Sequence, residues 1–397
     1  MTCPGCDRAA AYHTDADRTL VSLFGPITYQ RTYYYCRRCG QGQYPFDQHA
    51  GLPAHQLTPA VERLASLAGA VASSFDKGAE LLQEMSGVDL SESTVQRTTE
   101  DLGDRIAGLL AQGVTFGPRV VWPWRRDAQG RTVAYLSLDA TGIRQQGPKG
   151  QAAEGRMAYV GSIFNPLPPK ERVEPIPNAR RERMQARYLS GLYALEEMGP
   201  LMRQMAARVG LEQAELWVVL TDGGAGLEEF ARDNFNRPDL VLILDFYHAA
   251  SYLEKLAKVL HPQDEKASQA QAEQWCSLLK AEGGAVLLEV LRQWDWPARK
   301  SAALREQWAT VQTYFANNLH RMEYPEYLAE GWQIGSGVIE SACKTVVGQR
   351  LKGAGMRWAE AGAHALCHVR ALYRSDKGQW QDFWDRQCCG PLVQQAA

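Results

Sequence analysis

The sequence predicts an α/β protein whose largest domain is a mixed sheet flanked by helices. Between residues 131 and 260, short apolar segments typical of buried strands alternate with segments of helical periodicity. A long stretch of helical composition without any strand pattern follows this alternation, and a pair of Cys-x-x-Cys motifs lies near the N-terminus. We therefore expect an α/β domain with an all-helical insertion, preceded by two small N-terminal units.

Length and composition exclude several classes of protein. The chain has 397 residues, of which 45% are hydrophobic and 22% are charged, as in ordinary soluble globular proteins. No apolar run is long enough to cross a bilayer, and the N-terminus lacks the features of a secretory leader. We therefore expect a cytoplasmic protein without a membrane partner.

The formal net charge of −2 does not indicate binding to nucleic acid, so any DNA-binding surface must come from local clusters of cations. Two clusters occur, one between Lys170 and Arg187 and one between Lys344 and Arg357. The first mixes six cations with three glutamates, whereas the second contains no acidic residue. Taken alone, either cluster also matches a solvated protein surface.

Residues 1–50 predict a zinc ribbon. Two Cys-x-x-Cys motifs flank a β-hairpin signal, in which residues 19–24 and 27–35 are rich in β-branched and aromatic residues and Gly25-Pro26 separates them. Four thiolates hold Zn²⁺ tetrahedrally and leave no open position, so this single ion would be structural. The alternative is a pair of disulfides, which a reducing cytosol disfavours. The expected zinc ligands are Cys3, Cys6, Cys36 and Cys39.

Residues 51–112 predict a helical DNA-binding region. A first helix begins at Pro59, a second runs from Phe75 until Gly87 breaks it, and a third begins after a cap at Ser91 or Ser93. Two helices joined by a glycine-containing turn are typical of a helix-turn-helix, although helical hairpins that never touch DNA share the pattern. In the DNA-binding interpretation, the residues that face DNA are Ser93, Thr94, Gln96 and Arg97.

A linker rich in glycine and proline at residues 113–130 leads into the first part of the sheet domain, residues 131–260. The expected order of elements is β-β-β-α-β-α-β-α, and strands this apolar are typical of a sheet that is buried on both faces. The expected strands are 133–138, 157–164, 186–189, 216–220 and 240–244.

The remaining chain divides into two segments. Residues 261–331 are helical in composition and form the expected insertion. Residues 332–397 contain the last helix of the sheet domain, which begins near Gly335 with Ser336 as a suitable cap and carries Glu340, and then the C-terminal helices.

Three carboxylates are candidates for catalysis. Asp139 ends the first strand, Asp222 follows the fourth, and Glu340 lies in the first turns of the last helix. The carboxyl ends of adjacent buried strands border the crevice in which open α/β sheets place their sites. The three positions are those of acidic residues in an RNase H-like fold. Ligation by carboxylates alone selects Mg²⁺ or Mn²⁺, and two such ions support in-line phosphoryl transfer.

Each carboxylate also has an ordinary interpretation. Asp222-Gly223 matches a simple turn, and Asp139 matches an ordinary residue at a strand end. Glu340 and Lys344 match an exposed ion pair one helical turn apart. The joint placement of all three carboxylates is what favours a catalytic site.

Five motifs resemble the Mutator-like superfamily of DDE transposases, and in particular the bacterial insertion-sequence transposases of the ISKra type. The resemblance covers residues 135–384, and the two longest motifs are its most specific part. Asp139 is followed by Ala140, where many members of that superfamily have glycine. The motifs are Ser137–Thr141, Thr221–Gly224, Asp245–His248, Gly335–Ser341 and Arg350–Trp358.

The resemblance implies that Asp139, Asp222 and Glu340 bind two Mg²⁺ ions, and that the helical segment is the insertion domain of the family. It also implies that Asp245 and His248 support the site from the following helix. Asp245 ends a strand as well and is a rival metal ligand, but we expect it to support the ligands rather than to bind metal.

The resulting prediction is a Mg²⁺-dependent DNA transposase that cleaves the ends of its own element and joins the 3′-hydroxyl groups to target DNA. We expect it to act as a homodimer or larger assembly on DNA, in association with a prokaryotic nucleoid. The alternative is a transposase-derived regulator that binds DNA without cutting. A nucleotide-binding enzyme is disfavoured, because residues 222–226 lack the Rossmann spacing and a Walker lysine. The cations expected to hold phosphates are Lys344, Arg350, Lys352 and Arg357.

Overall fold

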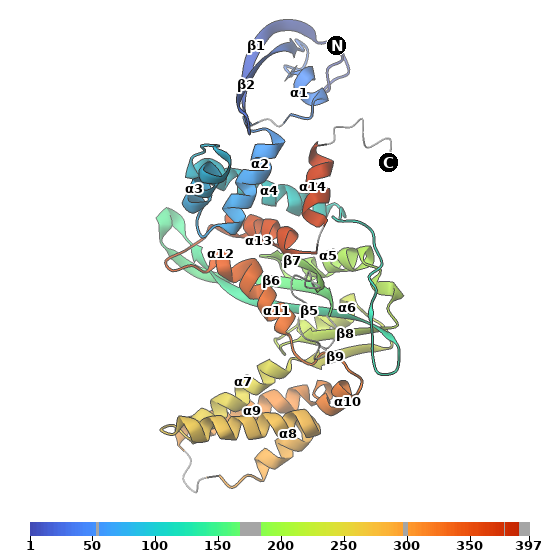
Figure 1. Ribbon diagram of the computed structural model, residues 1–397, viewed down its shortest axis with the longest axis vertical. Helices are drawn as coiled ribbons and strands as arrows, with labels where there is room; N and C mark the ends of the chain where they lie inside the picture. Colours follow the sequence, from blue (N-terminus) through green and yellow to red (C-terminus); the bar gives the residue numbers. More distant parts are fainter. Residues whose placement is uncertain (53–54, 167–183, 297–300, 377, 389–397) are drawn as a thin grey trace, which may run out of the picture. The chain divides into compact units, whose positions relative to one another are not determined.

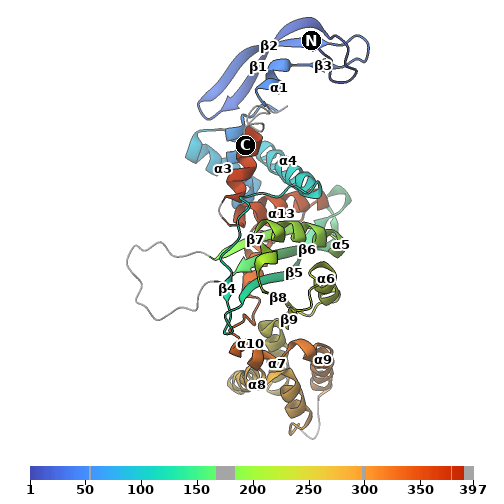
Figure 2. The ribbon, with the colours of Figure 1, turned by 90° about the vertical axis from the view of Figure 1, so that its right-hand side faces the viewer.

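The computed structural model describes residues 1–52, 55–166, 184–296, 301–376 and 378–388 (Figures 1 and 2). The chain divides into two compact units. Unit 1 comprises residues 1–118, 144–154 and 349–397, and unit 2 comprises residues 119–143 and 155–348.

Unit 1 begins with the hairpin of β1 (Ala11–Ser22) and β2 (Gly25–Tyr35), followed by β3 (Gly42–Gln43) and α1 (Pro45–His49). The hairpin loop is Leu23-Phe24, not Gly25-Pro26 as predicted, because Ser22 lies opposite Gly25. The Ser22 hydroxyl donates to the Gly25 carbonyl (2.7 Å) and accepts from the Phe24 N–H (3.1 Å), which closes the tighter turn.

The predicted helices of unit 1 are confirmed. The Ser74 hydroxyl caps α3, and this helix ends at Gly87, whose φ of 70° is left-handed. Ser91 caps α4 by accepting a hydrogen bond from the Thr94 N–H (3.3 Å), which decides between the two predicted caps. The helices are α2 (Pro59–Val71), α3 (Phe75–Ser86), α4 (Glu92–Ala111), α13 (Glu360–Arg374) and α14 (Gln379–Cys388).

The C-terminal helices belong to unit 1, so the predicted segment 332–397 is shared between the two units. Two buried arginines explain this grouping. Arg350 donates to the Gly69 carbonyl (3.0 Å), and Arg370 donates to the carbonyl of the neighbouring Ala70. These bonds satisfy carbonyl groups near the end of α2, which has no further helical turn to bond them.

Unit 2 is built on a sheet of six strands in the order β7-β6-β5-β8-β9, with β4 paired to β5. Strand β5 is parallel to β8, and β8 is parallel to β9, whereas β6 and β7 are antiparallel. The predicted mixed sheet and the predicted order of elements are confirmed. The strands are β4 (Arg125–Arg126), β5 (Thr132–Gln146), β6 (Ala152–Asn165), β7 (Gln185–Gly191), β8 (Leu216–Thr221) and β9 (Leu240–Leu244).

Strand β5 does not end at residue 138 as predicted but continues to Gln146. Its parallel partner β8 stops at Thr221, opposite Leu138, while β6 remains its neighbour on the other side. Because one edge stays paired, the backbone keeps its extended conformation past Asp139. Asp139 therefore lies inside a strand, at the point where the β5–β8 ladder opens.

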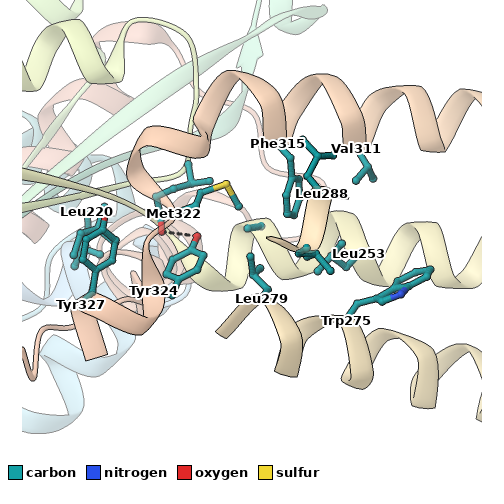
Figure 3. Close-up of a cluster of buried hydrophobic side chains, with 14 of the residues drawn as sticks. Leu220, Leu253, Trp275, Leu279, Leu288, Val311, Phe315, Met322, Tyr324 and Tyr327 are labelled. Carbon is teal, nitrogen blue, oxygen red and sulfur yellow. Dashed lines mark hydrogen bonds between the residues drawn. The ribbon is translucent and has the colours of Figure 1, made fainter. Parts of the chain in front are cut away.

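The helical segment shares one hydrophobic core with the sheet (Figure 3). Leu220 from β8 and Leu253 from α7 are fully buried in the same cluster as Trp275 and Leu279 from α8 and Phe315 from α9. Helices α7 to α10 lie together beside β9 (Figures 1 and 2). The helices of unit 2 are α5 (Leu195–Arg208), α6 (Leu227–Asn234), α7 (Phe246–Leu260), α8 (Glu265–Arg292), α9 (Ala302–Asn318) and α10 (Tyr324–Ala329).

The helix that carries Glu340 is not regular. It begins as α11 (Gly337–Ala342), widens to π-helical geometry over Cys343–Gly348 and ends as α12 (Gln349–Leu351). Short π-helical insertions often occur at functional sites, since they change the direction of neighbouring side chains. Among the described residues, no helix is both long enough and apolar enough to cross a membrane.

Candidate functional site

The parallel ladders that join β5, β8 and β9 of unit 2 end side by side. Leu138 of β5 pairs with Thr221 of β8, and Thr221 pairs with Leu244 of β9. Neighbouring strands lie about 4.8 Å apart, so the next residue on each strand stands in the same row. These residues are Asp139, Asp222 and Asp245.

Asp139 and Glu340 line one cavity of about 550 Å³, together with Cys343 and Lys344. Asp139 is half-buried, while Glu340 and Lys344 are exposed. One oxygen of the Asp139 carboxylate accepts the N–H of Ala140 (2.6 Å), and the other faces the Cys343 thiol (3.5 Å). The cavity thus joins a strand residue to a helix residue far away in sequence.

Burial raises the pKa of Asp139 above its usual value, and the negative charge of Asp222 adds to this effect. The Ala140 N–H opposes it, as does the charge of His248. Asp222 therefore lies close enough to Asp139 for their charges to interact. One oxygen of Asp222 accepts the N–H of Gly224 (2.8 Å), which forms the turn after β8.

The three carboxylates suit a hard divalent cation by chemistry, since all their donor atoms are oxygens. Their oxygen atoms do not all lie as close to one another as the ligand atoms of a single ion do. Within the described residues, the only group of three or more potential ligands whose donor atoms all lie within 4.8 Å of one another is the four-cysteine cluster. Mutual repulsion of ionised carboxylates favours such an open arrangement.

Asp245 is buried and accepts four hydrogen bonds. One oxygen accepts the N–H groups of Tyr247 and Ser336 (both 3.0 Å). The other accepts the N–H of His248 (3.3 Å) and the hydroxyl of Ser336 (2.6 Å). The carboxylate thereby ties the start of α7 to the start of α11, four residues before Glu340. Ser336 donates its hydroxyl to Asp245 and does not cap its own helix, contrary to the prediction.

The four predicted zinc ligands converge. The Sγ atoms of Cys3 and Cys39 are 3.4 Å apart, and those of Cys6 and Cys36 are 3.6 Å apart. These distances exceed the roughly 2.05 Å of a disulfide bond. Backbone N–H groups of Cys39 and Arg38 lower the pKa of Cys36 to about 6, so this thiol ionises before Cys6 and Cys39, whose pKa values are raised. The cluster could bind a metal ion such as zinc.

The predicted DNA-facing residues of α4 lie at its N-terminal end. Ser93 and Arg97 are exposed, whereas Thr94 and Gln96 are half-buried. The Arg97 guanidinium donates to the Ser93 carbonyl (3.1 Å), and Gln96 donates to Glu100 (2.9 Å). These are local bonds along one helix, so the side chains remain on an accessible surface.

Three of the four predicted phosphate-binding cations, Lys344, Lys352 and Arg357, are exposed. Arg350 is 1% exposed and does not offer its guanidinium to DNA, contrary to the prediction. Its guanidinium lies 4.4 Å from the ring of Phe75 and 5.1 Å from that of Trp358. Burial lowers the pKa of Arg350 to about 10. Arg350 therefore holds the helices of unit 1 together.

The other basic cluster falls largely outside the described residues, which omit 167–183. Arg187 at its end is buried in β7, with its guanidinium 5.9 Å from the ring of Trp122. This arginine is therefore part of the core and not of a cationic surface.

Sequence reasoning missed three residues near the carboxylates, namely Cys343, Tyr314 and Arg321. The Tyr314 hydroxyl donates to the Asp222 carbonyl (2.9 Å), and Arg321 donates to the hydroxyl of Thr221 (2.9 Å). Tyr314 and Arg321 come from the helical segment about a hundred residues away. No local sequence signal links them to the turn after β8.

A model of an uncharacterised protein family (UPF0236) matches residues 8–159 of the chain. This match covers the β1–β2 hairpin with Cys36 and Cys39 but not Cys3 and Cys6, and it continues through helices α2 to α4 and strand β5 into the first half of β6. A comparison with curated proteins found no match.

Proposed function

We propose that this chain is a DDE transposase that cuts the ends of an insertion sequence and joins them to target DNA. The observation that carries the proposal is the alignment of Asp139 and Asp222 at the open end of the β5–β8 ladder, with Glu340 in the same cavity as Asp139. Three carboxylates near one strand edge and a late helix are ligands suited to the ions of two-metal phosphoryl transfer.

The topology of unit 2 supports an RNase H-like interpretation of the sheet. Three long strands, β5 to β7, precede the first helix of unit 2, and the parallel strands β5, β8 and β9 are adjacent. Along the chain, helices α8 to α10 come between β9 and the helix of Glu340. In this interpretation these helices are the insertion of the family. The uncharacterised family that matches residues 8–159 is known in transposase-like insertion-sequence proteins, which also favours the proposal.

Two Mg²⁺ ions, when bound, would supply Lewis-acid stabilisation of the attacking and leaving oxygens. Asp139, Asp222 and Glu340 would hold them through carboxylate oxygens. Lys344, exposed on the wall of the same cavity, would neutralise a phosphate of the bound strand. Asp245 would fix the start of α11 and with it the approach of Glu340.

DNA recognition is assigned to two parts of unit 1. Helix α4, with Ser93, Thr94, Gln96 and Arg97 at its start, follows α3 through a turn at Gly87 as in a helix-turn-helix. The four-cysteine hairpin, with one structural Zn²⁺, would add a second contact. Two element ends must be cut in one event, so we propose a homodimer or larger assembly on DNA.

The decisive experiment uses the chain with linear duplex DNA that carries the flanks of its own gene, in the presence of Mg²⁺. The wild type should bind these ends and release 3′-hydroxyl termini. Asp139→Asn and Glu340→Gln should bind the ends normally, but their cleavage rate should fall at least about 100-fold. Loss of a metal ligand lowers activity more than loss of a residue that only hydrogen-bonds to a ligand.

Glu282→Gln is the matched control, since it removes one exposed carboxylate from α8. It should leave binding and cleavage unchanged. End binding by the wild type without any cleavage would favour the transposase-derived regulator. Unchanged cleavage in Asp139→Asn would show that the carboxylates are wrongly assigned.

A further inference from the structure

The helical segment contacts the turn that carries Asp222. The hydroxyl of Tyr314, on α9, donates to the main-chain carbonyl of Asp222 over 2.9 Å. The ring of Tyr314 stacks on that of Tyr252 from α7, with centroids 3.9 Å apart and an interplanar angle of 11°. Because the stack restricts rotation of the ring, the hydroxyl is held in place against the turn.

A second contact comes from the short helix η3 (Leu319–Arg321), directly after α9. Arg321 is 4% exposed and donates to the Thr221 hydroxyl over 2.9 Å, one residue before Asp222. Its guanidinium is oriented by the side-chain oxygen of Asn318 at 3.1 Å from Nε. The helical segment thus makes two contacts here. It bonds the side chain of Thr221 at the end of β8 and the main-chain carbonyl of the next residue, Asp222.

The far end of the same turn is also held. Glu228, in the first turn of α6, contacts His320 at 2.9 Å and Arg321 at 3.8 Å. The turn between Thr221 and Glu228 is therefore bracketed at both ends by residues of η3. Charged partners on both sides limit the freedom of a glycine-rich loop that would otherwise be mobile.

Gly223 makes the contact with Tyr314 possible. Its φ is +82°, and a Cβ there would lie 3.0 Å from the Tyr314 hydroxyl and 2.9 Å from Leu244. Any other residue would be strained and would push the tyrosine away. The glycine after Asp222 thus serves the close approach of the helical segment as well as the turn.

We propose that Tyr314 and Arg321 are positioning residues, through which the helical segment sets the orientation of the Asp222 carboxylate toward the metal site. This inference rests on the proposed function. A hydrogen bond to the Asp222 carbonyl restrains the peptide plane that follows the residue, and so restrains the direction of its side chain. The helical segment would then help to position a metal ligand of the site.

The test compares Tyr314→Phe with Tyr324→Phe in the full chain. Tyr314→Phe removes one hydroxyl and keeps the ring that stacks on Tyr252. Tyr324→Phe removes an equivalent bond, since the buried Tyr324 hydroxyl donates to the carbonyl of Leu244 (3.0 Å) at the end of β9. Both variants lose one tyrosine hydroxyl bonded to a strand-end carbonyl, but only the first loses it at Asp222.

Two measurements are made without DNA. Amide hydrogen exchange over residues 221–228 should accelerate in Tyr314→Phe and not in Tyr324→Phe. Mn²⁺ affinity, measured by electron paramagnetic resonance, should fall about 10-fold in Tyr314→Phe, as for loss of a group that orients a metal ligand. Arg321→Lys, which keeps a cation near Thr221, should lose less affinity than Arg321→Met.

Unchanged Mn²⁺ affinity in Tyr314→Phe, or an equal loss in Tyr324→Phe, would overturn the inference while leaving the proposed function intact. A wild type that binds no Mn²⁺ and cuts no DNA would overturn the proposed function, and the positioning role with it. Faster exchange of the turn together with weaker Mn²⁺ binding in Tyr314→Phe alone is the supporting result.

Discussion

Asp245 shows how one residue connects two distant parts of the candidate site. Its carboxylate caps α7 through two N–H groups and binds the backbone and hydroxyl of Ser336. With only 2% of its surface exposed, the side chain depends on these four donors to offset the cost of burying its polar oxygens. The residue therefore orders the backbone ahead of Glu340, and both of its oxygens are engaged in this role.

We predict that Asp245→Asn lowers the free energy of unfolding by about 2 kcal/mol, because an amide nitrogen faces donors where an oxygen accepted before. Urea unfolding measures the loss. Asp239→Asn is the control, since Asp239 is exposed and pairs with Arg237 at the surface (2.9 Å); it should change stability by less than about 0.5 kcal/mol. Equal effects of the two variants would contradict the role of Asp245.

Among the elements, the pair formed by α4 and α13 packs with little space between the helices. A Cβ on Gly103 would lie 2.2 Å from the carbonyl oxygen of Ala365. The same helix α13 buries His368, whose Nε2 lies 3.2 Å from that of His364 one turn earlier. Burial, together with the charge of His364, lowers the pKa of His368 to about 3. A neutral imidazole is therefore part of the packed helix.

This packing predicts a loss of stability in acid. In the unfolded chain, His368 takes up a proton near pH 6.5, whereas in the folded chain it does so only near pH 3. Its contribution is complete above pH 6.5 and declines as the pH falls toward 3, by about 2 kcal/mol between pH 7 and pH 5. Urea unfolding of the wild type and of His368→Gln at both pH values tests this. The variant should lose less stability on acidification, and identical losses would contradict the prediction.

For the molecule as a whole, the two units differ in how they are stabilised. Unit 2 has a large apolar core that runs from the sheet into the helices. Around its cysteines, the N-terminal hairpin has a small buried cluster of Cys3, Ala10 and Cys36, with Cys6 and Tyr34 packed against it. So small an apolar cluster cannot offset the conformational entropy of ordering about fifty residues. We therefore expect the hairpin to depend on a metal ion held by the four cysteines.

We predict that the purified chain carries one zinc ion, and that removing it with a chelator unfolds residues 1–52 while the core of unit 2 remains folded. Zinc content by mass spectrometry and hydrogen exchange along the chain measure the two effects. Cys36→Ser should likewise lose the zinc ion and unfold residues 1–52. Cys276→Ser, which changes a half-buried thiol of α8, should retain the zinc. Slow exchange in the hairpin after full removal of zinc would refute the dependence.

Local patterns predicted most of the elements because their causes are local. Uninterrupted apolar residues predict the strands of unit 2, and β9 has the predicted bounds Leu240–Leu244. The start of α7 at Asp245 follows from a side chain that caps its own helix. The hairpin loop was misplaced by two residues, because Ser22 and its bonds to the next residues outweigh the turn preference of Gly25-Pro26.

The sequence by itself determined the α/β class, the order of the strands along the chain, the four converging thiols and the acidic residues next to the buried apolar stretches of three strands. Apolar periodicity, capping and ligand spacing are properties of residues close in sequence, so the sequence alone shows them. Only the tertiary structure decided that Arg350 is buried and that Tyr314 and Arg321 hold the turn of Asp222. These contacts depend on which distant parts of the chain pack together. Residues about a hundred positions apart share no periodic sequence pattern that would predict their contact.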